Sequence, residues 1–324
     1  MSFDIQYLLF LQGLRNATGG IFNELFNAIT KFAVDIMPFL PFIVFWGVDK
    51  KWGYRYISTL WIGEVLNGVI KLTVCAYRPW IRSELIEPAG DSKVAATGYS
   101  FPSGHTMNGT AIYGTTVAWQ WNKRRWVAIL CMVMIALTGF SRNFLGVHTP
   151  QDVLVGFCES VIIILVVGKV MDKVSGNEKT LDLLTLAGVI AIIAVLLYVN
   201  LKSYPMDYVD GVLLVDPQSM MNDTFKATGA FLGFLIGSYL ERHYIRYEIP
   251  AGTSCLPFMT CAGAFIAFSW KTYFAGATIV AAFGDHWGNF IARCLMMLFV
   301  MILWPICIRK AAEKERAAGR KAAA

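Results

Sequence analysis

The sequence predicts an all-α integral membrane protein, built as a bundle of about nine transmembrane helices. Of its 324 residues, 56% are hydrophobic and 15% are charged, which is too apolar for an ordinary soluble protein of this length. The apolar residues also form blocks. Several blocks reach the roughly 20 residues that a helix needs to cross a bilayer core of about 30 Å. A very hydrophobic soluble helical protein is the alternative that these two observations disfavour.

The first segment is predicted to lie on the membrane rather than cross it. Residues 3–14 are too short and too mixed to span a bilayer, and are typical of an interfacial helix. Residues 1–20 lack a basic start, an apolar run and a small-residue cleavage site, so we expect the first apolar block to be retained. We therefore assign 1–20 to an interfacial amino-terminal segment.

Nine apolar segments follow as candidate spans. The third, fourth and seventh are short and contain Gly or polar residues, so we expect them to pack inside the bundle. In the seventh, Gly229, Gly233 and Gly237 recur every four residues and indicate close helix packing. The candidate spans are 22–48, 56–76, 105–121, 126–142, 150–170, 181–200, 225–241, 253–272 and 287–308.

The Lys and Arg residues predict an orientation for these spans. If the spans alternate, most of the 28 basic residues fall at one set of ends, in 50–55, 123–125, 169–179, 242–246 and 309–321. The positive-inside rule places these ends in the cytoplasm. The amino terminus and the acidic loop 201–224 then face outward, and residues 309–324 form a basic cytoplasmic tail.

Three polar clusters are predicted to meet at the outer face. They are Lys71 with Arg78-Pro79, then Pro102-Ser103-Gly104-His105, and then Ser141-Arg142 with His148 and Asp152. Ionisable residues at the edges of membrane spans are costly and therefore indicate function. Lys71, Arg78 and Arg142 would repel one another in a poorly solvated place, and a phosphate dianion would relieve that repulsion.

The two histidine segments each suggest a chemical role. Ser103 can cap the third span, so that Gly104 and the first N–H groups point at an anion beside His105. Thr149 can cap the fifth span with Pro150 at its first position, which brings Asp152 within reach of His148. The carboxylate would fix the tautomer and leave the other ring nitrogen free to attack. Taken alone, the P-S-G-H segment could equally be an ordinary helix start, and for His148 with Asp152 a satisfied buried polar pair would be the favoured interpretation.

Together the clusters match a known signature. The pattern K-x6-R-P, P-S-G-H and S-R-x5-H-x3-D resembles that of the type 2 phosphatidic acid phosphatase family, over about residues 55–170. The resemblance implies a phosphatase core in which His148 attacks phosphorus, Asp152 orients it, and His105 protonates the leaving oxygen and later activates water. It also implies that Lys71, Arg78, Ser103, Gly104 and Arg142 bind the phosphate, without a metal or other cofactor.

The chain is accordingly divided into an interfacial segment (1–20), a catalytic membrane core (21–175), additional transmembrane helices (176–308) and the basic tail (309–324). Nine spans also resemble the topology of the glucose-6-phosphatase branch, and sphingosine-phosphate phosphatases have a similarly extended bundle. The seven cysteines show no CxxC pair or metal-ligand spacing.

The expected activity is metal-independent hydrolysis of a phosphomonoester or diphosphate through a phosphohistidine, at the extracytoplasmic face of a multi-pass protein. A lipid substrate is favoured: phosphatidate, phosphatidylglycerophosphate, a sphingoid phosphate or a polyprenyl diphosphate. A soluble sugar phosphate is the alternative. A lipid phosphotransferase and an anion transporter are further alternatives, although no inverted repeat is apparent. Partners are expected to be the phosphorylated molecule and membrane lipids, with no nucleic acid.

Overall fold

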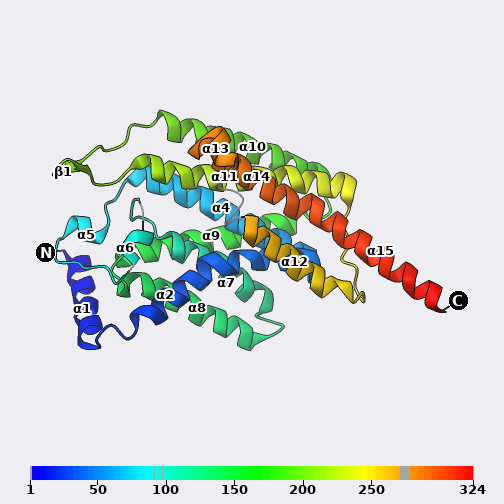
Figure 1. Cartoon of the computed structure of the whole chain (residues 1–324), viewed down its shortest axis with the longest axis horizontal. Coiled ribbons are helices and arrows are strands. Elements are labelled where there is room, and N and C mark those ends of the chain that lie inside the picture. Colours follow the sequence, from blue (N-terminus) through cyan, green and yellow to red (C-terminus); the bar gives the residue numbers. More distant parts are fainter. Residues whose placement is uncertain (1, 91, 97, 271–277, 324) are drawn as a thin grey trace. The chain divides into compact units, whose positions relative to one another are not determined.

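A computed structural model confirms that the chain is helical (Figure 1). It describes residues 2–90, 92–96, 98–270 and 278–323. Within these ranges the only strands are β1 (Tyr208–Val209) and β2 (Val212–Leu213), which pair antiparallel in a short hairpin. The helices are α1 (Phe3–Ala17), α2 (Asn23–Lys31), α3 (Leu40–Gly47), α4 (Lys50–Val74), α5 (Pro79–Arg82), α6 (Ser92–Ala95), α7 (Gly104–Gln120), α8 (Arg125–Phe144), α9 (Pro150–Val174), α10 (Glu178–Leu201), α11 (Pro217–Leu240), α12 (Cys255–Ser269), α13 (Val280–Phe283), α14 (Asp285–Leu298) and α15 (Trp304–Ala323).

Each of the nine predicted spans coincides with helix. Tighter or wider helical turns at 32–39 join α2 to α3, and a wider turn at Phe299–Leu303 joins α14 to α15. The end of the predicted span 253–272, at residues 271–272, lies outside the described residues. The described residues contain six helical stretches long and apolar enough to cross a membrane: Asn23–Gly47, Lys50–Arg82, Arg125–Phe144, Pro150–Val174, Glu178–Leu201 and Asp285–Lys321. The protein therefore has the character of a multi-pass membrane protein, and the count of nine spans stays a prediction.

The predicted loop at 201–224 is too long at its carboxyl end. Residues 217–224 belong to α11, which begins at Pro217. The Asp216 side chain accepts a hydrogen bond from the Gln218 N–H at 3.0 Å, so it caps the helix start. The polar residues of this segment suggested a loop, but Pro at the first helical position and Asp before it are a helix-start signal.

The residues group into two compact units, each discontinuous in sequence. The first unit comprises Met1–Pro38, Ile62–Val167 and Tyr198–Thr224, and the second comprises Phe39–Trp61, Gly168–Leu197 and Phe225–Ala324. All eight predicted site residues lie in the first unit. The second unit has a core of large apolar side chains that includes Phe45, Trp46 and Met297.

Within the second unit, the predicted glycine stripe packs α11 against α14. A Cβ atom added at Gly229 would overlap the backbone of Phe290, and one at Gly233 would overlap the backbone of Cys294. A Cβ atom at Gly237 would instead overlap the side chain of Met301, in the turn that follows α14. The packing role predicted for this stripe is confirmed, because only glycine lets the two backbones approach this closely.

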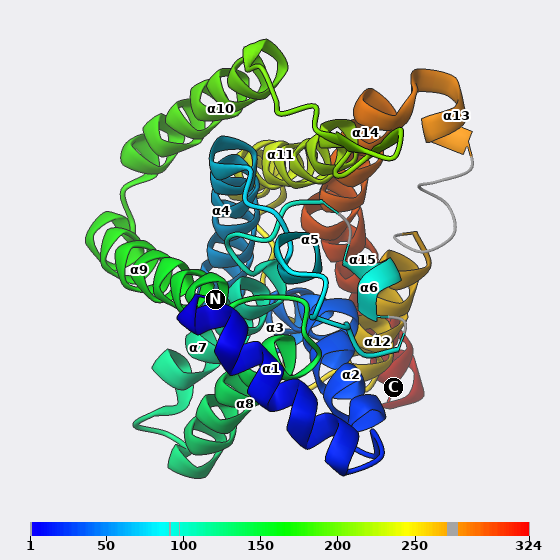
Figure 2. The ribbon, with the colours of Figure 1, turned by 90° about the vertical axis from the view of Figure 1, so that its left-hand side faces the viewer.

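In the first unit, α1 lies across the ends of α2 and α8 instead of running beside them (Figure 2). The buried Arg15 of α1 donates to the carbonyl oxygen of Phe144, at 3.0 Å, and to that of Glu87. Asp4 forms an ion pair with Arg82 at 2.8 Å. The helix expected at 3–14 is thus present, and its predicted location in the membrane interface is not tested by these contacts.

Candidate active site

His148 lies in the turn between α8 and α9. Gly146 adopts a left-handed backbone conformation there (φ 73°), which glycine tolerates without strain. The N–H groups of Val147 and His148 donate to the Arg142 carbonyl oxygen at 3.1 and 3.3 Å, and Asn143 Nδ2 donates to the His148 carbonyl oxygen at 2.9 Å. The turn therefore fixes the His148 backbone, and its side chain is only 2% exposed.

Asp152 holds one edge of the His148 ring. The Thr149 N–H donates to Asp152 Oδ2 at 2.8 Å, and the Asp152 N–H donates to Thr149 Oγ1 at 3.4 Å. This reciprocal cap confirms that Thr149 starts the helix, and it fixes the carboxylate rotamer. His148 Nδ1 lies 3.3 Å from Asp152 Oδ2, which is the contact that the i, i+4 spacing predicted.

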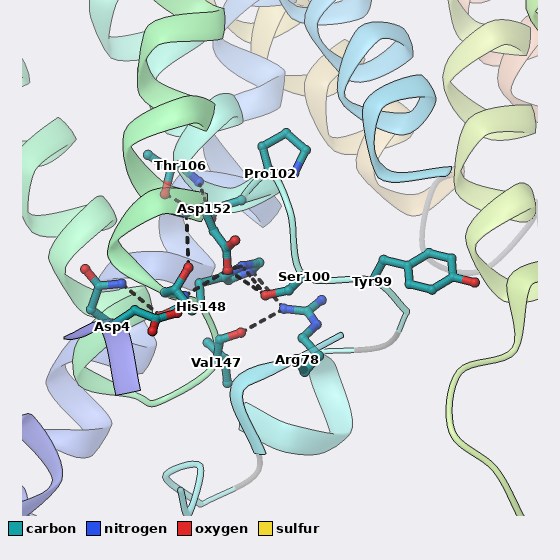
Figure 3. Close-up of polar contacts among 12 residues, drawn as sticks. Asp4, Arg78, Tyr99, Ser100, Pro102, Thr106, Val147, His148 and Asp152 are labelled. Atoms are coloured by element: carbon teal, nitrogen blue, oxygen red, sulfur yellow. Dashed lines mark hydrogen bonds and ion pairs between the residues drawn. The ribbon is translucent and has the colours of Figure 1, made fainter. Parts of the chain in front are cut away.

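Arg78 contacts the opposite edge of the ring. Its Nη1 lies 2.9 Å from His148 Nε2 and 3.0 Å from the Val147 carbonyl oxygen. Since a guanidinium only donates, Nε2 must be the unprotonated nitrogen, and the ring proton is assigned to Nδ1, facing Asp152. Burial and the Arg78 charge hold the pKa of His148 well below its usual range, so the ring is neutral with its lone pair on Nε2. Figure 3 shows Arg78 and Asp152 pointing toward His148.

The three predicted phosphate-binding cations are all buried. Lys71 Nζ donates to the carbonyl oxygens of Tyr99 and Ser100, each at 3.3 Å, and to that of Pro102. Arg142 Nη1 lies 3.3 Å from Thr30 Oγ1, and the Arg142 Nε atom has no hydrogen-bond partner among the described residues. A buried guanidinium with an unused donor is costly, and an anion beside it would remove that cost.

The segment Ser103–His105 forms the start of α7. Ser103 is the N-cap, as predicted, because its Oγ accepts from the Thr106 N–H at 3.4 Å. Its own N–H donates to the Asp152 carbonyl oxygen at 2.9 Å, which ties the start of α7 to α9. A Cβ added at Gly104 would lie 3.9 Å from Lys71 Cε, so Gly104 is beside the cation cluster.

His105 completes the cluster. It follows Gly104 in the first turn of α7, so it lies at the helix start that is beside Lys71. The predicted site residues are separated by up to 81 positions in the sequence, between Lys71 and Asp152. Buried cations beside an oriented histidine can bind a phosphate-sized anion and stabilise the charge that develops on it.

Sequence reasoning missed three polar residues of this site. Ser100 Oγ donates to Asp152 Oδ2 at 2.6 Å, Asn143 holds the His148 carbonyl, and Thr30 contacts Arg142. No spacing rule indicates Thr30, which is distant in sequence. Ser100 is close to the P-S-G-H motif, but its role depends on a backbone path that periodicity does not predict.

A second buried contact joins α4 to α9. Asn67 Nδ2 donates to Glu159 Oε2 at 3.0 Å. Asn67 lies one turn before Lys71 on α4, and Glu159 lies two turns after Asp152 on α9.

The described residues contain no group of three or more His, Cys, Asp and Glu side chains placed to hold a metal ion. Metal independence stays a prediction.

Known proteins resemble this part of the chain. The model of the PAP2 superfamily matches residues 52–175. Phosphatidylglycerophosphatase B of Bacillus subtilis (strain 168) is 30% identical over 166 residues, which cover 47% of this chain and 76% of the relative. Sphingosine-1-phosphate phosphatase 1 of Rattus norvegicus is 25% identical over 166 residues, covering 49% of this chain but only 34% of the relative. Undecaprenyl-diphosphatase of Sulfolobus acidocaldarius is 26% identical over 125 residues, covering 37% and 56%. No solved structure matches the chain.

Proposed function

Because the chain belongs to the PAP2 superfamily, we propose that it is a membrane phosphatase that releases phosphate from a phosphorylated lipid through a phosphohistidine at His148. One observation carries this proposal. His148 is buried and neutral, with Asp152 on its Nδ1 edge and an arginine of the cation cluster on its Nε2 edge. A neutral imidazole that is oriented by a carboxylate, with a cation close to its unprotonated nitrogen, supports a role as nucleophile toward phosphorus.

The reaction proceeds in two steps with balanced proton transfers. In the first, the Nε2–P bond forms as the bond from phosphorus to the leaving oxygen breaks, and His105 gives its proton to that oxygen. In the second, water attacks phosphorus, the Nε2–P bond breaks, and His105 takes the water proton. Asp152 stabilises the positive charge that the His148 ring acquires in the first step.

The cations supply binding and charge stabilisation. Lys71, Arg78 and Arg142 hold the equatorial phosphate oxygens as charge redistributes, together with the Ser103 hydroxyl and the Gly104 N–H. Arg78 must also change its position during the reaction. Its Nη1 donates to Nε2, so it must turn toward the phosphate oxygens before that nitrogen can attack.

The proposed substrate is a lipid phosphate or a polyprenyl diphosphate. The names of the relatives support this class, since they specify phosphatidylglycerophosphate, sphingosine 1-phosphate and undecaprenyl diphosphate. The family model matches residues 52–175, so residues 176–308 are assigned no activity in this proposal. By the charge bias of the sequence, the site faces the extracytoplasmic side and the carboxyl terminus the cytoplasm.

The test is phosphate release by purified protein in detergent. We would compare phosphatidate, phosphatidylglycerophosphate, sphingosine 1-phosphate, undecaprenyl diphosphate and glucose 6-phosphate. The lipids should be hydrolysed, and His148→Ala should abolish turnover. His243→Ala is the matched control, because that histidine lies in the second unit, paired with Asp182 at 2.9 Å, and should leave turnover unchanged.

Trapping the intermediate tests the nucleophile directly. Substrate labelled with ³²P should transfer acid-labile, base-stable label to the wild-type protein and to His243→Ala, but not to His148→Ala. Full turnover by folded His148→Ala protein would end the proposed mechanism. Transfer of phosphate to a second lipid without release of free phosphate would instead identify a phosphotransferase, and rapid hydrolysis of glucose 6-phosphate alone would identify a sugar phosphatase.

A further inference from the structure

Ser100 connects the cation cluster to the proposed nucleophile. It lies in the segment that precedes α7, and 1% of its surface is exposed. Its backbone N–H donates to the Ala76 carbonyl oxygen at 2.7 Å, and its carbonyl oxygen accepts from Lys71 Nζ at 3.3 Å. Its side chain points the other way, toward His148 and Asp152 (Figure 3). One residue thus contacts both halves of the site.

The Ser100 hydroxyl can serve two partners at once. It donates its proton to Asp152 Oδ2 at 2.6 Å, and its oxygen lies 3.5 Å from His148 Nδ1. A hydroxyl that donates its single proton still has lone pairs that can accept. The Nδ1–H of His148 therefore faces two acceptors, the Asp152 carboxylate and the Ser100 oxygen. Both favour the tautomer that leaves Nε2 unprotonated.

We propose that Ser100 is a positioning residue for the phosphoryl-transfer step, holding the Asp152 carboxylate and the His148 ring in the attacking arrangement through its hydroxyl. This inference rests on the proposed function. Asp152 Oδ2 also accepts a hydrogen bond from the Thr149 N–H, but a single hydrogen bond still allows the carboxylate to rotate about it. The hydrogen bond from the Ser100 hydroxyl restricts that rotation. The carboxylate is then held facing His148 Nδ1 when the ring becomes positive.

The structure separates this role from phosphate binding. Lys71 contacts the Ser100 backbone and not its hydroxyl. Replacing Ser100 by Ala removes the bond to Asp152 but keeps the backbone bonds to Ala76 and Lys71. The substitution should therefore slow the chemical step and leave the binding of phosphate to the cations unchanged.

The first measurement is a split between kcat and KM. Ser100→Ala should lower kcat roughly 10- to 100-fold, the cost of a lost hydrogen bond to a charged group, with KM within about twofold of wild type. Ser160→Ala is the matched control. Ser160 is also a buried serine (0% exposed), and its Oγ donates to the Met107 carbonyl oxygen at 2.7 Å, away from Asp152. It should keep kcat, while Ser100→Thr, which retains the hydroxyl, should recover most of the lost rate.

The second measurement compares two inhibitors of the same variants. Orthovanadate mimics five-coordinate phosphorus bonded to Nε2, whereas inorganic phosphate binds to the cations alone. Ser100→Ala should weaken inhibition by vanadate about as much as it lowers kcat, with inhibition by phosphate unchanged. Equal weakening of both inhibitors would mean that the substitution merely deforms the site, and the positioning role would be wrong.

The outcomes distinguish this inference from the proposed function. If wild-type protein neither releases phosphate nor responds to vanadate, the proposed function itself is wrong. If wild type is active and inhibited by vanadate, but Ser100→Ala matches it in kcat and vanadate affinity, only the role of Ser100 is overturned.

Discussion

Replacing Asp152 by Asn removes the negative charge beside His148 while preserving the size of the side chain. Asp152 Oδ2 accepts three hydrogen bonds, from Ser100 Oγ at 2.6 Å, the Thr149 N–H at 2.8 Å and His148 Nδ1 at 3.3 Å. An amide oxygen in this place can keep these bonds, but it is neutral. In the proposed mechanism the His148 ring becomes positive as it bonds to phosphorus, so the loss should fall on the transition state and not on the resting protein.

The separation of 3.3 Å between His148 Nδ1 and Asp152 Oδ2 sets the size of the effect. At an effective dielectric constant near 20, two unit charges at this distance attract by about 5 kcal/mol. A loss of that size corresponds to a fall in kcat of roughly 1,000- to 10,000-fold. We therefore expect Asp152→Asn to bind substrate with a KM close to that of wild type. Its kcat should be about 1,000-fold lower than that of wild type.

The assay is steady-state phosphate release from the best lipid substrate in detergent. Glu159→Gln is the control. Glu159 is also a buried carboxylate of α9 (6% exposed against 4% for Asp152), and Gln keeps an acceptor for Asn67. It should retain kcat within about threefold. If folded Asp152→Asn protein keeps kcat within tenfold of wild type, or if Glu159→Gln loses as much, the assigned role of Asp152 is refuted.

Four further predictions follow from the same structure. Arg142→Ala should lower kcat/KM roughly 100-fold and weaken inhibition by inorganic phosphate, because an unused guanidinium donor is lost; unchanged phosphate inhibition would remove Arg142 from the site. The pKa of His148 in the folded protein lies below its value of about 6.5 in the unfolded chain. Below pH 6.5 the unfolded chain therefore binds more protons than the folded protein, and the free energy of unfolding should fall as the pH decreases. Thermal melts of His148→Ala should show a weaker fall; parallel curves would contradict this. Gly233→Ala should destabilise by about 1–3 kcal/mol, because its Cβ meets the Cys294 backbone, whereas Gly168→Ala, with open space, should not; equal melting temperatures would contradict the packing. EDTA should leave phosphate release unchanged, and loss of activity restored by Mg²⁺ would overturn metal independence.

The helices were largely predictable from the sequence because apolar block length is a strong signal. Each candidate span falls on a helix. The signal is weaker where polar residues begin a helix, so residues 217–224 were assigned to a loop although Pro217 starts α11. Which helices cross the bilayer is a separate question, since α7, α11 and α12 are not among the six stretches that satisfy length and composition.

The site was predictable where its residues act through local spacing. The Thr149 cap and the contact from Asp152 to His148 follow from positions within one helical turn. The contact from Arg78 to His148 Nε2 and the one from Ser100 to Asp152 depend on how distant segments cross, which no local pattern encodes. The motif predicted that Arg78 is present in the site, but not that it contacts His148 Nε2.

The hydrogen bond from Arg78 to Nε2 has a consequence for chemical selectivity. A molecule without negative charge does not compete with His148 for the Arg78 guanidinium. Neutral esters and neutral alkylating reagents should therefore find the lone pair of His148 Nε2 occupied by this hydrogen bond. Only an anionic compound that binds the Arg78 guanidinium would free His148 Nε2 for reaction. If His148 is the nucleophile, as proposed, its contact with Arg78 makes the resting site discriminate between anionic and neutral electrophiles.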